Sequence, residues 1–122
     1  MVLSRGLDGC LFLFDQSRWD QIAQDLNGSL FAKKLHRDFS RLMLHSAVVV
    51  DLDQLGRILI PEDLRALAHL TKEVVFAGSG DRVEIWDRGT YHAYLEAIET
   101  RAEHIAEEYA DARLAQKGDH AN

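Results

Sequence analysis

Asp53, Gly56 and Arg57 are the residues whose types and spacing most clearly suggest chemistry. An aspartate can close a turn by accepting hydrogen bonds from nearby backbone, and a glycine can adopt backbone angles that other residues avoid. A loop with this order could hold the Arg57 guanidinium outward in a fixed pose. The forked guanidinium group can donate two hydrogen bonds to guanine O6 and N7 or to a phosphate. The residues alone leave open the alternative of an exposed or internally paired arginine beside Asp53.

Basic residues also cluster on a helix that we expect from about residue 29. They are Lys33, Lys34, His36, Arg37 and Arg41. A basic helix face favours phosphate contact, so the two lysines and two arginines are candidate secondary contacts to a nucleic acid. The alternative is a solvated face opposite Leu35, Phe39 and Leu42 that packs on an acidic neighbour.

The charge distribution restricts any nucleic-acid site to a local patch. The chain has 122 residues and a net charge of -6, and residues 61–122 hold seven Lys and Arg against thirteen Asp and Glu. Binding to a phosphate backbone depends on basic residues that release counterions. A row of acids at four-residue spacing is interpreted as a solvent-facing helix surface without a metal. It consists of Glu99, Glu103, Glu107 and Asp111.

Enzyme chemistry has no candidate residues in the sequence. Six histidines are scattered without an HExxH pair, and no GxSxG, GxxxxGK[ST] or GxGxxG motif occurs. Cys10 is the only cysteine, so it forms no internal disulfide, and we interpret it as a buried, inert thiol in a reducing compartment. We therefore expect no catalysis, cofactor, metal or small-molecule substrate. We also expect a cytoplasmic protein without a membrane span or secretory signal.

The pattern of apolar and turn residues predicts an α+β protein. Strands are expected at residues 2–4, 10–14, 48–50, 57–60, 73–77 and 82–86, and helices after Asp15, from about residue 29, from Pro61 and over residues 87–115. Asp15 can cap the first helix, and Asn27-Gly28 can end it. Pro61 fits the first turn of the third helix.

Two parts of the chain resemble each other when the sequence is shifted by 72 residues. The shift aligns Val2 with Val74, Gly6 with Gly78, Leu13 with Ile85, Phe14 with Trp86, Asp15 with Asp87 and Trp19 with Tyr91 without a gap. We interpret these hairpin-then-helix segments as tandem copies. Residues 47–72 precede the second hairpin and only Met1 precedes the first, so we expect the first copy to lack its front half. A start codon upstream of Met1, or a trimmed front, is the expected cause.

Four segments, in order along the chain, carry a family resemblance. They are residues 4–11 (SRGLDGCL), 53–61 (DQLGRILIP), 72–75 (KEVV) and 81–87 (DRVEIWD). With them the chain resembles the MraZ family, bacterial regulators associated with the division and cell-wall gene cluster and built from two SpoVT/AbrB-like repeats. The resemblance implies a swapped-hairpin β-barrel formed by tandem repeats, with a linking helical hairpin and a long C-terminal helix. The expected division is a remnant of the first repeat at 1–21, linking helices at 22–45, the second repeat at 46–91, and the C-terminal helix with a polar tail at 92–122.

The resemblance further implies that DxxxR loops on a ring-like homo-oligomer bind repeated sites in promoter double-stranded DNA. In this sequence Arg57 and Gln54 would contact DNA, whereas Asp53, Gly56 and Pro61 would shape the loop. Repression of the division and cell-wall genes, by a cytoplasmic and nucleoid-associated protein, is the expected output. One alternative is a protein-interaction or assembly module that has lost DNA binding with the missing first loop. An antitoxin-like role, as in relatives of the same barrel, is a third hypothesis.

Overall fold

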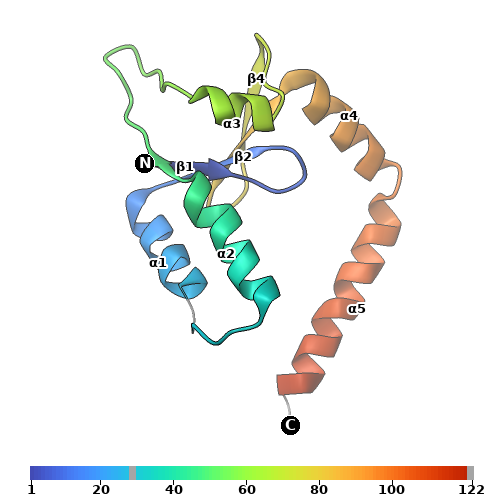
Figure 1. Ribbon diagram of the computed structural model, residues 1–122. Coiled ribbons are helices and arrows are strands. Elements are labelled where there is room, and N and C mark those ends of the chain that lie inside the picture. Colours follow the sequence, from blue (N-terminus) through green and yellow to red (C-terminus); the bar gives the residue numbers. More distant parts are fainter. Residues whose placement is uncertain (28–29, 121–122) are drawn as a thin grey trace. The chain divides into compact units, whose positions relative to one another are not determined.

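A computed structural model describes residues 1–27 and 30–120, which form five strands and five helices (Figure 1). The strands are β1 Val2–Arg5, β2 Leu11–Phe14, β3 Val48–Val49, β4 Val74–Gly78 and β5 Val83–Asp87. The helices are α1 Gln16–Leu26, α2 Lys34–Ser46, α3 Glu62–Leu67, α4 Arg88–Glu99 and α5 Ala102–His120. The chain divides into two compact units, Met1–Arg88 and Gly89–Asn122.

All five strands belong to one antiparallel sheet in the order β3-β1-β2-β5-β4. The β1–β2 and β4–β5 pairs are hairpins, and β2 pairs with β5 to join them. The sheet is open, with β3 and β4 at its edges. The predicted α+β class is confirmed.

The pairing of β2 with β5 is symmetric with respect to the 72-residue shift. Phe12 lies opposite Glu84, which is the position 72 residues later, and the flanking pairs are Leu11 with Ile85 and Leu13 with Val83. Elements of the same kind also begin 72 residues apart, at Val2 and Val74, Leu11 and Val83, and Gln16 and Arg88. The two hairpins therefore meet through equivalent strands, each followed by a helix.

One face of the sheet packs against α3. Leu3, Leu11 and Ile85 are fully buried, and they form a core cluster with Leu64 of α3 and the adjacent Ala68. Side chains alternate between the faces of a strand, so Leu11 points to this core while Phe12 points to the other face. The hydrophobic strand residues thus anchor α3, the helix that follows the candidate DNA-binding loop.

The opposite face of the sheet carries a cluster of aromatic side chains. The rings of Phe12 and Phe14 meet edge to face with centroids 5.9 Å apart, and Trp19 of α1 lies 5.7 Å from Phe14. The Arg82 guanidinium lies 4.7 Å from the Phe12 ring centroid, a cation–π geometry. Trp19 is buried, so it anchors α1 on this face of the sheet.

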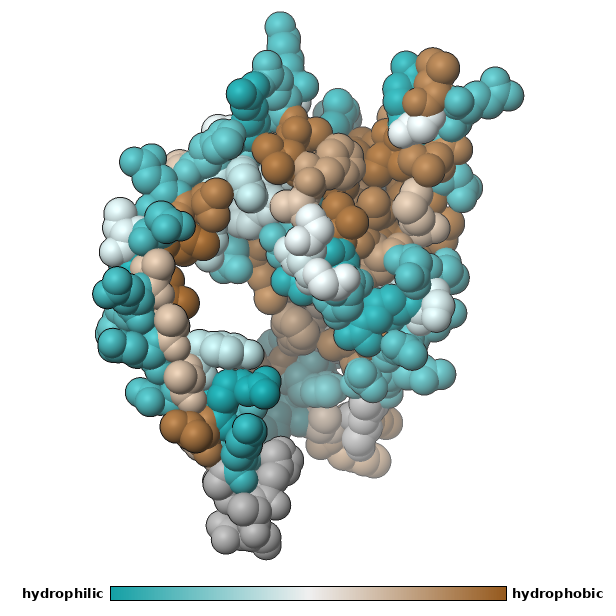
Figure 2. Space-filling view, turned by 180° about the vertical axis from the view of Figure 1, so that it is seen from behind, coloured by the Kyte–Doolittle hydropathy of each residue, from teal (hydrophilic) through white to brown (hydrophobic). Residues whose placement is uncertain are grey.

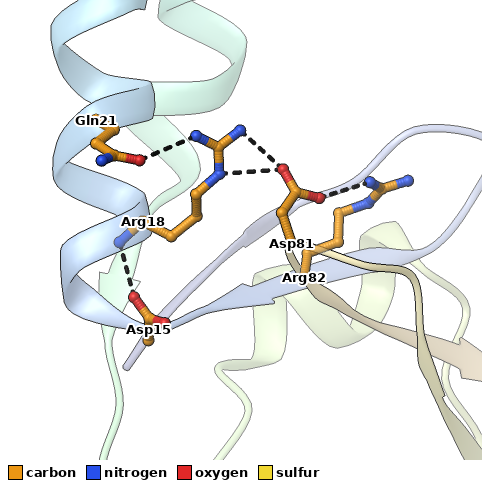
Figure 3. A network of polar contacts seen from close by, with 5 residues as sticks. All are labelled: Asp15, Arg18, Gln21, Asp81 and Arg82. Carbon is orange, nitrogen blue, oxygen red and sulfur yellow. Dashed lines mark hydrogen bonds and ion pairs between the residues drawn. The ribbon is translucent and has the colours of Figure 1, made fainter.

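Polar contacts tie α1 to the turn between β4 and β5 (Figure 3). Asp15 accepts a hydrogen bond from the Arg18 backbone N–H at 2.7 Å and so caps α1, as predicted. Nε and Nη2 of Arg18 both donate to Oδ2 of Asp81, at 3.0 and 2.8 Å, while Oδ1 of Asp81 accepts from Arg82 at 3.1 Å. These bonds link residues 63 positions apart in the sequence.

Three predicted elements differ from the structure. Residues 57–60 form no strand: Ile58 and Ile60 pack against the core while Leu59 is 86% exposed, so the apolar pattern there reflects alternate burial in an irregular segment. The second helix begins at Lys34 rather than near residue 29, and residues 28–29, including the predicted stop at Gly28, lie outside the described residues. The last helix is divided by a turn at residues 100–101, where the Thr100 hydroxyl donates to the Ala97 carbonyl at 2.8 Å.

Gly6 provides a test of packing at the first hairpin turn. A Cβ at this position would lie 2.6 Å from the Cys10 carbonyl oxygen and 2.8 Å from the Cys10 Sγ. Gly6→Ala should therefore lower the free energy of unfolding by about 1–3 kcal/mol, the usual cost of overpacking. Urea denaturation measures the change. Gly78→Ala is the matched control, because a Cβ at the position 72 residues later meets nothing within 4 Å; equal losses in both variants would contradict this account.

Candidate nucleic-acid interface

Residues 53–57 form a turn in the connection between β3 and α3, which projects from unit 1 at the upper left of Figure 1. We call this turn the 53–57 loop. Its two ends are bonded, because the Asp53 N–H donates to the Arg57 carbonyl at 2.8 Å and the Gly56 N–H donates to the Asp53 carbonyl at 3.0 Å. Gly56 has a φ of 77°, a left-handed conformation that favours glycine. The loop-shaping role of Gly56 stays a prediction, which its positive φ supports.

The Asp53 carboxylate organises the loop from inside. Oδ1 accepts the backbone N–H groups of Leu55 and Arg57, both at 2.8 Å. Oδ2 accepts Nε of the Arg57 guanidinium at 3.0 Å. One side chain therefore fixes the backbone of the turn and the direction of its arginine.

Arg57 is available to solvent while it is held in this way. Its side chain is 70% exposed, and its contact with Asp53 uses Nε. The terminal nitrogens of the guanidinium are the pair that spans two acceptors on a base edge or phosphate. Arg57 is thus both exposed and paired with Asp53, as the alternative without a nucleic acid described, and its contact with DNA stays a prediction.

The hydrogen bonds that Asp53 accepts lower the pKa of its carboxyl group. The backbone N–H of Arg57 is the largest cause, while partial loss of solvation opposes the shift, and the Arg57 side chain and the Leu55 N–H lower the pKa further. Because the pKa of Asp53 is depressed in the folded loop, these bonds stabilise the loop at pH values above the ordinary pKa of an aspartate. Their contribution is lost as the pH falls through the folded-state pKa.

The other two predicted site residues are Gln54, which lies within the loop, and Pro61, which follows it in the chain. Gln54 is exposed beside Leu55, which is itself 74% exposed. Pro61 is the N-cap residue of α3 rather than a residue of its first turn, and its carbonyl accepts the Arg65 N–H at 2.9 Å. Pro61 therefore marks the point where the loop segment passes into the helix anchored by the core.

Exposed hydrophobic residues lie on the segment that carries the loop, and sequence reasoning did not anticipate them as a surface. They are Leu52, Leu55 and Leu59, together with Val49 of the preceding strand β3, and all are more than half exposed. Figure 2 shows hydrophobic atoms gathered over this part of the molecule. The signal was present in the sequence as three leucines flanking an arginine.

The second predicted site, the basic group on α2, is largely engaged within its own helix. Asp38 accepts Lys34 Nζ at 2.6 Å and Arg41 Nη1 at 3.2 Å, and Arg37 donates to the Ala32 carbonyl. The Lys34 hydrogen bond is the main reason why the pKa of Asp38 is lowered. Asp38 is the residue that the interpretation of this cluster missed.

The segment that carries the 53–57 loop and the start of α2 lie at opposite ends of unit 1 in Figure 1. The loop lies at the top of unit 1, whereas the first turns of α2, which carry these residues, lie at its bottom. Lys33 is the exposed N-cap residue of this helix. A nucleic acid bound at the loop would therefore meet the α2 group only through a second contact region.

Other kinds of site find little support in the described parts of the chain. Among residues 1–27 and 30–120, no three His, Cys, Asp or Glu side chains gather as metal ligands do. Burial raises the pKa of the Cys10 thiol to about 11, with a smaller contribution from Glu84. The predicted burial of Cys10 is confirmed, since the residue is 2% exposed. No helix in these ranges has both the length and the apolar character of a membrane span.

Comparison with protein-family models assigns a family to part of the chain. Residues 43–113 match the family model described as "MraZ protein, putative antitoxin-like". The matched region is more than half of the chain, and it includes the 53–57 loop, α3, the β4–β5 hairpin and α4.

Replacement of Asp53 tests how the loop is held. Asp53→Ala removes the acceptor of the Leu55 and Arg57 amides, so both amides should exchange with solvent faster while those of the buried strand β2 keep their rates. Hydrogen exchange followed by NMR measures this. Asp51→Ala, at an exposed aspartate two positions earlier, is the control. Unchanged exchange at both amides in Asp53→Ala would show that the carboxylate does not order the loop.

Proposed function

The chain belongs to the MraZ family of regulatory, antitoxin-like proteins, and on that premise we propose that it is a sequence-specific DNA-binding regulator of transcription. The observation that carries the proposal is the geometry of the 53–57 loop. Asp53 holds Nε of an arginine that remains 70% exposed. Sequence-specific contact with duplex DNA is the activity that this arrangement suits best.

Arg57 would be the reading residue of this loop. Its terminal nitrogens can donate to O6 and N7 of a guanine in the major groove, which is the commonest specific contact between proteins and DNA. Gln54, exposed in the same turn, would provide a second polar contact. Asp53, Gly56 and Pro61 would position the loop without touching DNA. Lys33, Lys34, Arg37 and Arg41 would make secondary phosphate contacts, limited by the pairing of two of them with Asp38.

One loop alone would bind DNA weakly. A bidentate arginine contributes roughly 1–3 kcal/mol of discrimination against a wrong base, so useful affinity requires several loops on one assembly. The exposed leucines around the loop support self-association, because monomers rarely expose contiguous apolar patches of large area. We therefore include a ring-like homo-oligomer in the proposal, with repeated promoter sites as its ligand.

The fold proposal is a swapped-hairpin barrel made from tandem repeats. The Phe12–Glu84 pairing and the 72-residue spacing of equivalent elements support the repeat interpretation. The proposed segments are 1–21, 22–45, 46–91 and 92–122. The open edges at β3 and β4 are positions where further strands could pair and close a barrel.

The regulatory output would be repression of a division and cell-wall gene cluster. A protein assembly that occupies promoter DNA hinders the entry of RNA polymerase. Such a protein would work in the cytoplasm in association with the nucleoid. It would need no cofactor or catalytic residue, since occupancy of DNA is itself the signal.

A protein-interaction module is the second candidate function. It is favoured by the "antitoxin-like" description of the family and by the exposed leucines, which would bind a protein rather than DNA. In this alternative the pairing of Arg57 with Asp53 would serve only to order the loop.

Arg57→Ala separates the two functions. On the DNA-binding proposal, affinity for a duplex containing the promoter upstream of the protein's own gene should fall by roughly tenfold or more, since each assembled copy loses a bidentate contact. The dependence of affinity on salt should also become shallower. Fluorescence anisotropy with labelled duplexes measures both effects.

Two control variants sharpen this experiment. Lys117→Ala removes one positive charge from the exposed surface of α5 and should leave affinity nearly unchanged. Arg57→Lys keeps the positive charge but removes the guanidinium group that can donate two parallel hydrogen bonds. This variant should retain non-specific binding and lose its preference for the promoter. Promoter affinity that is equal in Arg57→Ala and the wild-type protein would refute the assignment of this loop.

A further inference from the structure

Leu55 places an apolar side chain in solvent at the tip of the 53–57 loop. The backbone hydrogen bond that closes this turn leaves Gln54 and Leu55 as its two central residues. The Leu55 side chain is 74% exposed, whereas Ile58 and Ile60 of the same segment pack against the core cluster. Turns are dominated by Gly, Pro, Asn, Asp and Ser. A leucine at this position therefore serves neither the packing of the core nor the usual chemistry of a turn.

The backbone at Leu55 is fixed by the same atom that fixes Arg57. Oδ1 of Asp53 accepts both backbone N–H groups at 2.8 Å. Residues two positions apart have Cα atoms at most about 7 Å from each other, and successive bases of a DNA strand rise by about 3.4 Å. With the length of the side chains added, Leu55 and Arg57 would reach bases within about three base-pair steps of each other.

The atoms that suit Arg57 determine which groove the loop would enter. Guanine O6 and N7 both lie in the major groove. Thymine displays its C5-methyl group in that groove and not in the minor groove, and apolar side chains are the groups that contact this methyl. A loop that brings Arg57 to a guanine edge therefore carries Leu55 into the groove where thymine methyl groups are accessible.

We propose that Leu55 is a specificity-determining residue that contacts the C5-methyl group of a thymine close to the guanine bound by Arg57. This inference rests on the proposed DNA-binding function of the loop and adds to it the kind of sequence that each loop recognises. That sequence is a guanine and a thymine within about three base pairs of each other. The contact removes the apolar surfaces of the leucine and the methyl group from water together.

The same contact would discriminate against a C·G pair at the thymine position. Cytosine presents its N4 amino group in the major groove and carries no methyl group. Leu55 would take water from this donor without replacing the lost hydrogen bond, which is unfavourable. A phosphate group likewise offers charged oxygens and no apolar partner. The leucine side chain therefore favours a thymine edge over both alternatives.

Uracil substitution tests the contact without changing the protein. Uracil differs from thymine only in lacking the C5-methyl group, so a duplex made with deoxyuridine keeps its base pairs and phosphates. The affinity of the full chain for the promoter duplex should fall by about fourfold for each methyl group that is contacted, as expected for one buried carbon. Several loops on one assembly would multiply the loss. Fluorescence anisotropy with the thymine and uracil duplexes measures the ratio.

Two variants assign the effect to one residue. Leu55→Ala removes the apolar contact, so it should bind the thymine and uracil duplexes with nearly equal affinity. The amide bond from Leu55 to Asp53 involves only the backbone and is available to alanine as well. Leu59→Ala is the matched control, because it shortens an exposed leucine of the same segment outside the loop. This control should keep the wild-type preference for thymine.

The possible results separate this inference from the function on which it rests. Equal affinity of the wild-type protein for both duplexes would overturn the thymine contact and leave DNA binding intact. A Leu55→Ala variant that still prefers the thymine duplex would show that another residue senses the methyl group, and would overturn the proposal too. If the wild-type protein bound neither duplex, the proposed function itself would fail and the thymine contact with it.

Single base changes test whether the two contacts belong to one loop. Thymines are replaced one at a time by uracil, and guanines one at a time by 7-deazaguanine, which lacks the N7 acceptor. The thymines that matter should lie within about three base pairs of a guanine at which the change weakens binding by the wild-type protein but not by Arg57→Ala. Sensitive thymines found only at greater distances would contradict the assignment to Leu55.

Discussion

The pairing of β2 with β5 is the constraint on which the structure of unit 1 depends. An isolated two-stranded hairpin is marginally stable in water, and this pairing joins two hairpins into a five-stranded sheet. It also brings Leu11 and Ile85, both fully buried, into one layer with Leu64 of α3. The position of α3 fixes one end of the projecting segment, and buried Val50 fixes the other. The 53–57 loop is thus carried by contacts between strands that are distant in sequence.

The order inside the loop has a different origin from the order of its anchors. Asp53 and Arg57 are exposed, and an exposed ion pair adds little to global stability. Their hydrogen bonds act locally, on the backbone amides of two residues and the direction of one guanidinium. The stability of the sheet and the order of the loop therefore have separate origins in this fold. The sheet determines where the loop is, and the Asp53 carboxylate determines how its arginine is presented.

Sequence reasoning succeeded where local rules determine the structure. Both hairpins, the Asp15 cap and the burial of Cys10 follow from turn residues, capping chemistry and alternation. The same reasoning failed at residues 57–60, because alternate burial of Ile58 and Ile60 has the period of a strand although these residues form an irregular segment. Ion pairing of Asp38 with two cations of α2 was also missed, since the sequence does not say which of several nearby charges will pair. The pairing of β2 with β5 is a long-range contact that no local rule predicted.

The proposed function makes different demands on the residues of the projecting segment. Arg57 has to stay accessible to DNA, whereas the leucines outside the 53–57 loop can be buried between copies of the chain. The number of arginines that act together then depends on how many chains the proposed assembly contains. The direction of each arginine depends on the hydrogen bonds that Asp53 accepts.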